Sequence, residues 1–306
     1  MAAVETQAEG RGRTGEAYLF LTFTMLCWAG NAVAGRYAVG EISPMALVAL
    51  RWLLVVVLLA IFARKQIVRD WRALRARWRF VLAMGALGFT AFNALFYQAA
   101  HTTTAINIGI LQGAIPIFVL AGGFLFHRQR VTGLQIAGMA VTLVGVILVA
   151  TGGDIAHLFE LHFVPGDLLM VGACALYAGY TIALKRKPAI SFLSFFAGVA
   201  LAAFLSSLPL LGLEAALGTL QWPTTVGLAV LIYAAIFPSF VSQISFMHGV
   251  QMIGAGRAGI FINLVPVFGS IMAVALLNEP FRLYHLGALA LVLGGIALAE
   301  RGKPRH

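Results

Sequence analysis

The chain has 306 residues, of which 61% are hydrophobic and only 10% are charged, and its mean hydropathy is +0.93. These values exclude an ordinary soluble protein and predict one integral membrane domain, because no hydrophilic stretch is long enough to fold alone. The two cysteines lie in apolar segments and offer neither a disulfide framework nor a metal-ligand spacing, so we expect no metal and no cofactor.

The apolar segments predict ten membrane-spanning helices of roughly 20 residues each. In chain order they lie near residues 18–39, 45–63, 79–99, 104–126, 132–151, 167–184, 190–212, 225–247, 255–277 and 283–300. The first segment contains Ala32-Val33-Ala34, which resembles a signal-peptide cleavage site. Cleavage there would leave nine helices and an incomplete first half, so we expect an uncleaved first helix.

The net charge of +10 follows the predicted topology. With the N-terminus in the cytoplasm, most Lys and Arg residues of the loops fall on the cytoplasmic side, and most acidic loop residues fall outside, which is the positive-inside pattern. We therefore expect a multi-pass protein of the bacterial inner membrane, with both termini cytoplasmic and no nucleic-acid partner. The basic segment 70–78, with a tryptophan near each end, is expected to form a short interfacial helix against anionic lipid.

The second half of the chain repeats the first. Residues 96–150 align without a gap on residues 246–300, which pairs Pro116 with Pro266 and Gly109 with Gly259. Because five helices are an odd number, the second copy must cross the membrane in the opposite direction. The sequence therefore predicts an all-α integral membrane fold with ten transmembrane helices in two inverted five-helix repeats. The expected parts are a disordered cytoplasmic tail (1–16), the first repeat (17–151), an external linker (152–166), the second repeat (167–300) and a cytoplasmic tail (301–306).

A duplicated hydrophobic block is the usual build of a secondary transporter, whose substrate lies between the halves near the bilayer midplane. The paired prolines fall within the predicted fourth and ninth helices. Each removes a backbone hydrogen bond and should bend its helix, although the fold alone could demand both bends. We therefore assign Pro116 and Pro266 to gating.

Several different short motifs follow one another along the chain. They are Trp28-Ala29-Gly30-Asn31, Ser43-Pro44 followed by Arg51, the two central prolines, Gly166-Asp167 and Asn278-Glu279-Pro280. In this order they resemble the EamA family of the drug/metabolite transporter superfamily, and most closely its YddG-type exporters of aromatic and other amino acids. Gln129 departs from the pattern, because a glutamate is expected there. The resemblance implies ten helices and export of a small metabolite.

Polar and aromatic side chains at membrane depth are the candidates for a substrate site, because a bare amide in hydrocarbon must face protein or water. Each could instead pack in the core or form an interhelical hydrogen bond. The group 93–101 ends the third helix, and its repeat partner is 243–251. The expected substrate-binding residues are Trp28, Asn31, Asn93, Tyr97, Gln98, Gln112, Tyr177, Tyr180, Gln243 and Asn263.

Ionisable residues suggest gating or coupling. Arg51 lies about two turns inside its span, where an arginine indicates function by default, although it could snorkel outward or pair with Glu41 or a carbonyl. Arg36 lies near the outer end of the first helix and is expected to act as a gate or to snorkel. If transport is coupled to protons, His101 or His248 would carry them; we favour transport down the substrate's own gradient.

The chain is expected to be an exporter of aromatic and other neutral amino acids by alternating access through a central cavity, not an enzyme. No nucleophile–base motif is present, and the absence of carboxylates near the centre of any span suits a neutral zwitterion. Alternatives are a transporter of another small metabolite, such as a nucleotide-sugar or a drug, and a lipid flippase or channel. The expected partners are the small-molecule substrate and the lipid bilayer, with the protein acting as a monomer. His157 and His162 lie in the linker with Asp154 and Glu160, where a weak surface metal site is the alternative to the solvated side chains that we expect.

Overall fold

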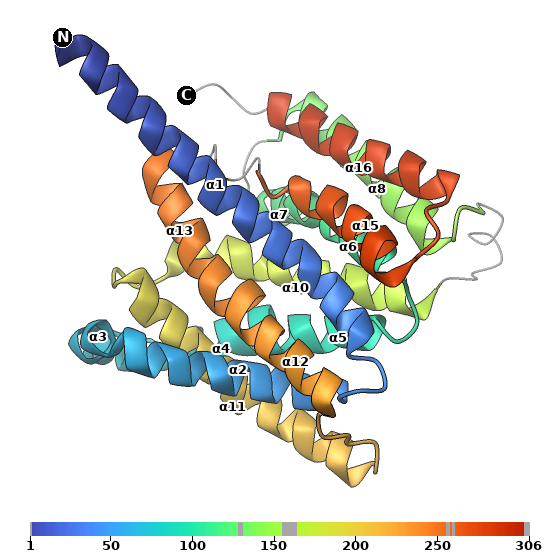
Figure 1. The fold of residues 1–306 in the computed structure, drawn as a ribbon. Helices are drawn as coiled ribbons and strands as arrows, with labels where there is room; N and C mark the ends of the chain where they lie inside the picture. Colours follow the sequence, from blue (N-terminus) through green and yellow to red (C-terminus); the bar gives the residue numbers. More distant parts are fainter. Residues whose placement is uncertain (1, 128–130, 155–163, 255–257, 259–260, 303–306) are drawn as a thin grey trace.

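The computed structural model describes residues 2–127, 131–154, 164–254, 258 and 261–302, and the regular secondary structure of this part is helical, with short loops between helices (Figure 1). The helices of the first half are α1 (Ala2–Tyr37), α2 (Pro44–Phe62), α3 (Arg64–Ala76), α4 (Trp78–Gly85), η1 (Ala86–Ala91), α5 (Phe92–Ala99), α6 (Ala105–Gln112), α7 (Ile115–His127) and α8 (Gly133–Ala150). Those of the second half are α10 (Pro165–Ala183), η2 (Leu184–Arg186), α11 (Phe192–Ala216), α12 (Thr225–Ala234), η3 (Ala235–Val241), α13 (Ser242–Ile253), α15 (Leu264–Leu277) and α16 (Leu283–Arg301).

Within the described residues, nine helical stretches are long and apolar enough to cross a membrane. α4, η1 and α5 form one such stretch, α6 with α7 another, and α12, η3 and α13 a third. The ninth predicted helix, 255–277, is represented by α15, which has 14 residues and is shorter than the others. The rest of that predicted helix lies largely outside the described residues.

The N-terminal segment differs from its prediction. Residues 2–16 were expected to form a disordered tail, but α1 begins at Ala2 and continues without a break into the first span. This segment contains no proline, and its three Ala, three Glu and two Arg residues favour helix, whereas its three Gly residues disfavour it. Extending an existing helix costs much less than nucleating one, so the span that follows supplies the nucleus.

The two central prolines begin helices instead of bending them. α6 ends at Gln112, a turn covers residues 113 and 114, and Pro116 is the second residue of α7. Pro266 is likewise the third residue of α15, after a turn at residues 262 and 263. In the first turn of a helix the backbone N–H has no intrahelical partner, so a proline there removes no hydrogen bond. The predicted bends are therefore breaks that lie just before each proline.

Two π-helical segments, η1 and η3, lie about 150 residues apart in the chain, each in the middle of a span. Short π-helical turns inside α-helices leave backbone carbonyls without their usual partners and occur often at functional sites. Pro238 accounts for η3, because proline lacks the N–H that a regular helix needs at its position. In η1 no proline is present, and the side chain of Asn93 donates to the carbonyl of Phe89 instead (2.6 Å).

Helices about 150 residues apart in the chain pack in pairs. α8 lies along α16, and α2 packs against α11 (Figure 1). A Cβ placed on Gly138 would lie 2.4 Å from the carbonyl oxygen of Gly295, so only glycine allows α8 and α16 to approach this closely. α6 crosses α15 at Gly109 and Gly269, where an added Cβ at Gly109 would lie 3.6 Å from the partner Cα.

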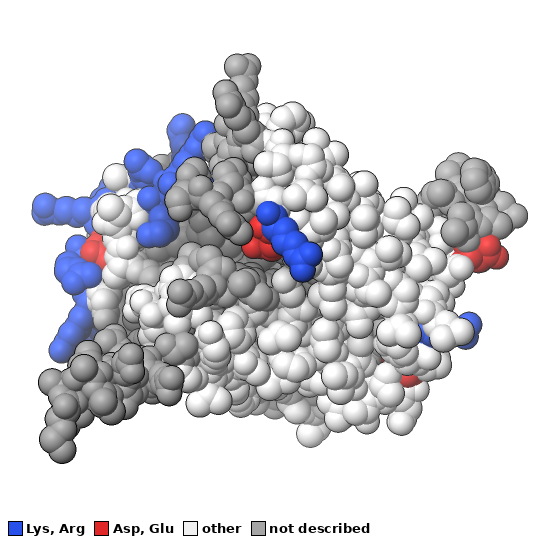
Figure 2. Space-filling view, turned by 90° about the horizontal axis from the view of Figure 1, so that it is seen from above, with Lys and Arg blue, Asp and Glu red and all other residues white. Residues whose placement is uncertain are grey.

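Charged side chains divide the molecule into two ends. Lys and Arg residues gather at one end (Figure 2), which carries α3 and the Lys185–Lys187 run and which we call the basic end. Arg77 donates to the carbonyl of Arg186 and so ties α3 to the end of η2 (2.9 Å). The opposite end carries Glu41, Glu214 and Glu279, and we call it the acidic end. The helices run between these two ends (Figure 1).

Candidate functional site

A cavity of about 1000 Å³ lies between helices of both halves. It extends from Arg51, near the middle of α2, to Gln135 and Glu300 at the basic end. Its wall is mostly apolar and aromatic, with a few amides, which is the usual composition of a small-molecule site. The cavity is lined by these residues of the expected set: Trp28, Asn31, Arg51, Asn93, Gln112, Pro116, Tyr177, Gln243 and Asn263.

Other expected residues lie outside the cavity. Gln98 is exposed on the outer surface, because it is displaced by about 100° around the helix from Tyr97. His101 is exposed beyond the end of α5, and His248 is exposed with its ring stacked on Phe20 at 5.9 Å. None of these three side chains is among the described residues that line the cavity.

Three further expected residues have structural contacts away from the cavity wall. Tyr180 covers Gly88, where an added Cβ would lie 2.5 Å from the tyrosine ring. Pro266 is buried against Gly113 at the crossing of α15 with α6. Arg36 lies at the acidic end, beside Glu279.

Arg51 lies at the end of the cavity, 5% exposed, and is enclosed by neutral side chains. Its Nε donates to Ser239 Oγ (2.6 Å), and its Nη1 donates to Asn93 Oδ1 (3.0 Å). Nη1 also donates to Asn31 Oδ1 (3.2 Å) and to the hydroxyl of Tyr97. We call these four partners, with Arg51, the arginine cage. In the described part of the chain no carboxylate lies within ion-pair distance of Arg51, and Glu41 bonds to Thr224 instead.

The acceptors of the arginine cage are held in place by second hydrogen bonds. Ser239 Oγ donates to the carbonyl of Ala234 (2.7 Å), which the π-helical turn of η3 leaves available. Asn93 Nδ2 donates to the carbonyl of Phe89 in η1. The Tyr97 hydroxyl donates to Asn31 Oδ1 (3.0 Å). Each oxygen therefore faces the guanidinium, and the two π-helical segments position the cage.

Ser239 was missed in the sequence, although it completes the cage. A serine alone at membrane depth is usually satisfied by its own helix and gives little signal. The signal that was present is the dipeptide Pro238-Ser239 inside a span, which marks a disturbed helix.

Aromatic rings form the walls beside the cage. Trp28 donates from its indole nitrogen to the carbonyl of Pro238 (3.1 Å), and its ring lies 5.4 Å from that of Phe246. The rings of Phe92 and Tyr177 lie 5.2 Å apart and are tilted by 48°. These rings offer apolar faces and are fixed by their neighbours, so they suit the apolar part of a small ligand.

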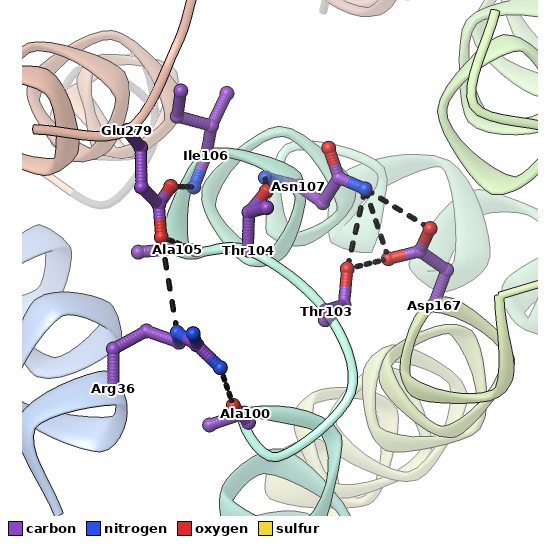
Figure 3. Close-up of polar contacts among 9 residues, drawn as sticks. All are labelled: Arg36, Ala100, Thr103, Thr104, Ala105, Ile106, Asn107, Asp167 and Glu279. Atoms are coloured by element: carbon purple, nitrogen blue, oxygen red, sulfur yellow. Dashed lines mark hydrogen bonds and ion pairs between the residues drawn. The ribbon is translucent and has the colours of Figure 1, made fainter. Parts of the chain in front are cut away.

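At the acidic end, a carboxylate joins three parts of the chain. Glu279 Oε1 accepts from the backbone N–H of Ala105 (2.9 Å), and Oε2 accepts from that of Ile106 (3.0 Å) (Figure 3). Glu279 therefore caps the N-terminus of α6, where helix N–H groups favour negative charge. Arg36 Nε lies 3.8 Å from Glu279 Oε1, and Nη1 donates to the carbonyl of Ala100. These contacts join α1, α5, α6 and the segment after α15 at the acidic end.

A second cluster lies beside the first (Figure 3). Asp167, in the first turn of α10, is completely buried, accepts from Thr103 Oγ1, and accepts from Asn107 Nδ2 at 3.0 Å. The neighbouring Gly166 leaves no room for a side chain, because a Cβ there would lie 2.6 Å from the carbonyl of Ala99. Only the motif Gly166-Asp167 indicated this contact in the sequence.

Among the described residues outside the spans, His101 and Asp70 have shifted pKa values. Although the His101 side chain is partly exposed, its partial burial and the nearby charge of Arg36 lower its pKa below the usual value. A hydrogen bond from Arg69 holds the pKa of Asp70 well below its usual range. Asp70 Oδ2 also accepts from the backbone N–H of Ser191 (3.0 Å), at the start of α11. The basic end is thus also joined by a carboxylate at a helix N-terminus.

Among the residues that the structure describes, no three His, Cys, Asp or Glu side chains form a group that could hold a metal ion. His157, Glu160 and His162, which were considered for a weak metal site, lie outside the described residues, as does Gln129.

The family model of EamA-like transporters matches the chain twice, over residues 15–151 and 164–300. An uncharacterized transporter of Bacillus subtilis, YetK, is 28% identical over 284 residues, which covers 92% of this chain and 85% of YetK. A probable terminal-alkyne amino-acid exporter of Streptantibioticus cattleyicolor is 25% identical and covers 92% of both chains. A crystal structure with 19% identity superposes with a TM-score of 0.63 over 93% of this chain and 96% of that chain, which indicates a shared fold.

Proposed function

The chain belongs to the EamA-like transporter family, and from this premise we propose that it exports amino acids by alternating access across a bacterial inner membrane. The expected substrates are aromatic and other neutral amino acids. The amino-acid exporter among the relatives supports this substrate class.

The observation that carries the proposal is the position of Arg51 at the end of a largely apolar cavity. A guanidinium stays protonated, and burying a charge without a counter-ion costs several kcal/mol, at least about 3 when one partner of a pair is missing. Neutral hydrogen-bond acceptors offset part of this cost. The carboxylate of an amino acid would offset the rest, while its apolar side chain contacts the rings of Trp28 and Tyr177.

The proposed architecture has ten transmembrane helices in two inverted five-helix repeats. It is supported by the double match of the family model, by the matched π-helical segments and by the matched breaks before Pro116 and Pro266. α15, with the segment before it, would be the ninth helix. The expected boundaries 17–151 and 167–300 remain our proposal for the two repeats.

The proposed orientation places the basic end, with both termini, in the cytoplasm, because cationic loops are retained there. The cavity lining reaches that end, whereas at the other end the Arg36–Glu279 contact joins the helices. We therefore assign the structure to an inward-facing state. Outward opening would require the two halves to separate at the acidic end and to close around the basic end.

A nucleotide-sugar fits this cavity less well than an amino acid. Arg51 is the only cationic side chain among the described residues that line it, whereas a diphosphate carries at least two negative charges. One guanidinium suits one carboxylate.

Export from proteoliposomes tests the proposal. Purified protein is reconstituted, vesicles are loaded with a panel of radiolabelled amino acids, and efflux is measured against protein-free vesicles. We expect saturable efflux of at least one aromatic or other neutral amino acid. Efflux that never saturates would favour a channel, and no efflux of any amino acid would refute the proposed substrate class. Gln98→Ala serves as the matched control, since this amide lies outside the cavity.

A further inference from the structure

The arginine cage retains two unused hydrogen-bond donors. In the described part of the chain, Arg51 Nη2 and Asn31 Nδ2 donate to no acceptor. Neither nitrogen belongs to the buried polar atoms that lack a partner, so both retain access to the cavity that their residues line.

The orientation of Asn31 follows from its partners. Its Oδ1 accepts from both Arg51 Nη1 and the Tyr97 hydroxyl, and a guanidinium can only donate. An amide turned the other way would place N–H groups against N–H groups. The nitrogen of Asn31 therefore points away from the guanidinium contact and remains free for a ligand.

The charge of Arg51 is the second independent observation. Its four hydrogen-bond partners are neutral, and among the described residues no acid pairs with it, although it is 5% exposed. A guanidinium with a free nitrogen matches the planar, singly charged carboxylate group in both shape and charge.

We propose that Arg51 and Asn31 form a recognition site for one carboxylate group of the transported molecule. One carboxylate oxygen would accept from Arg51 Nη2 and the other from Asn31 Nδ2. This inference rests on the proposed function and deepens it, because it makes the carboxylate the obligatory part of the substrate. An amine that lacks a carboxylate should bind poorly, however well its ring fits the aromatic walls.

Three probes separate the parts of an amino acid. L-phenylalanine carries both charged groups, 3-phenylpropionate lacks the ammonium group, and phenethylamine lacks the carboxylate. The readouts are thermal stabilisation of the purified full chain by each probe, and efflux of radiolabelled L-phenylalanine and phenethylamine from proteoliposomes.

Asn31→Asp is the decisive variant, because it keeps both accepted hydrogen bonds and places a carboxylate 3.2 Å from Arg51 Nη1. This internal carboxylate should pair with Arg51 in place of a ligand carboxylate, without destabilising the fold. Asn93→Asp, whose Oδ1 lies 3.0 Å from the same nitrogen, is the second variant. Gln98→Glu adds the same negative charge on the exposed face of α5 and is the control.

For the wild type and for Gln98→Glu, we expect L-phenylalanine and 3-phenylpropionate to stabilise the protein, with phenethylamine at least about tenfold weaker. Asn31→Asp should melt no lower than the wild type and lose the response to both carboxylates. Equal binding of phenethylamine and L-phenylalanine, or an unchanged carboxylate response in both Asp variants, would overturn the inference.

The failure of the inference and that of the proposed function give different results. If L-phenylalanine and phenethylamine are exported equally well, the exporter remains and the carboxylate site is refuted. If no amino acid is exported but 3-phenylpropionate stabilises the wild type and not Asn31→Asp, the site remains and amino-acid export is refuted.

Discussion

Arg51 donates a 2.6 Å hydrogen bond from Nε to Ser239 Oγ, and this contact joins the two halves of the chain at the end of the cavity. The residues are 188 positions apart in sequence. Ser239 is available for this contact because the π-helical turn of η3 directs its hydroxyl between the carbonyl of Ala234 and the guanidinium. The position of Arg51 therefore depends on both halves of the chain. A movement of one half relative to the other should displace its side chain.

Ser239→Ala should weaken substrate binding more than it weakens the fold. A hydrogen bond to a charged group contributes about 1.5–3 kcal/mol, and about 1.4 kcal/mol corresponds to tenfold in affinity. We expect KM for L-phenylalanine efflux to rise about tenfold, with a smaller change in maximal rate. Ser270→Ala is the control, because Ser270 donates to the Pro266 carbonyl of its own helix and does not contact Arg51. Equal KM changes in the two variants would contradict the role of Ser239.

Glu279→Gln should favour opening of the acidic end. It removes the charge that faces Arg36 and weakens the cap on α6, and a helix-terminus charge contributes about 0.3–2 kcal/mol. A cysteine at Ala100, in a background lacking Cys27 and Cys174, should react faster with an impermeant thiol reagent added from the acidic end. Glu41→Gln is the control on the same end, because Glu41 bonds to Thr224 and not to this cluster. Unchanged labelling in Glu279→Gln would show that this contact does not hold the closed state.

Gly295→Ala should destabilise the packing of α8 against α16. An added Cβ would lie 2.3 Å from Thr142 Oγ1 and 2.6 Å from the carbonyl oxygen of Gly138, so the helices must separate. Overpacking of this kind costs about 1–3 kcal/mol. Gly294→Ala is a closely matched control, because nothing lies within 4 Å of its added Cβ and alanine favours helix. The melting temperature of the purified protein should fall for Gly295→Ala and not for Gly294→Ala. Equal melting temperatures of the two variants would refute the close approach of the helices.

His101 should make stability sensitive to acid but not to mild alkali. Its pKa lies below the usual 6.5, mainly because burial disfavours the charged ring, so protonation is harder in the folded protein than in the unfolded chain. The contribution of His101 to the free energy of unfolding is therefore constant above about pH 7.5. It becomes destabilising as the pH falls below about 6.5, because the unfolded chain then binds the proton more readily. The melting temperatures of the wild type and of His101→Gln are compared from pH 5 to pH 8. The melting temperature of the variant should fall less at acid pH. The opposite order would contradict the lowered pKa.

The sequence predicted the helical membrane class and most spans, because an uncharged apolar segment of about 20 residues is long enough to cross the bilayer and too apolar for a water-exposed helix. It also identified Arg51, Asn31 and Asn93 as candidates, since polar groups at membrane depth must have a partner. It could not assign those partners. Arg51 was considered as a partner of Glu41, and only the packing of α2 against η3 brings Ser239 to it.

Side-chain direction accounts for the expected residues that lie elsewhere. Gln98 and His248 are close in sequence to residues that line the cavity or form the arginine cage. Each, however, lies on the outward face of its helix. The periodicity that separates Tyr97 from Gln98 could have indicated this. The breaks before Pro116 and Pro266 were harder to predict, because a proline inside a long apolar segment is compatible both with a bend and with a new first turn.

Counterflow of a radiolabelled amino acid tests the central claim most directly. Proteoliposomes that contain excess unlabelled L-phenylalanine are placed in a trace of labelled L-phenylalanine, with the wild type and Asn31→Asp compared. The account predicts transient accumulation of label with the wild type, because an alternating carrier exchanges substrate across the membrane, and none with Asn31→Asp. Equal accumulation with both proteins, or simple equilibration of the label with the wild type, would contradict it.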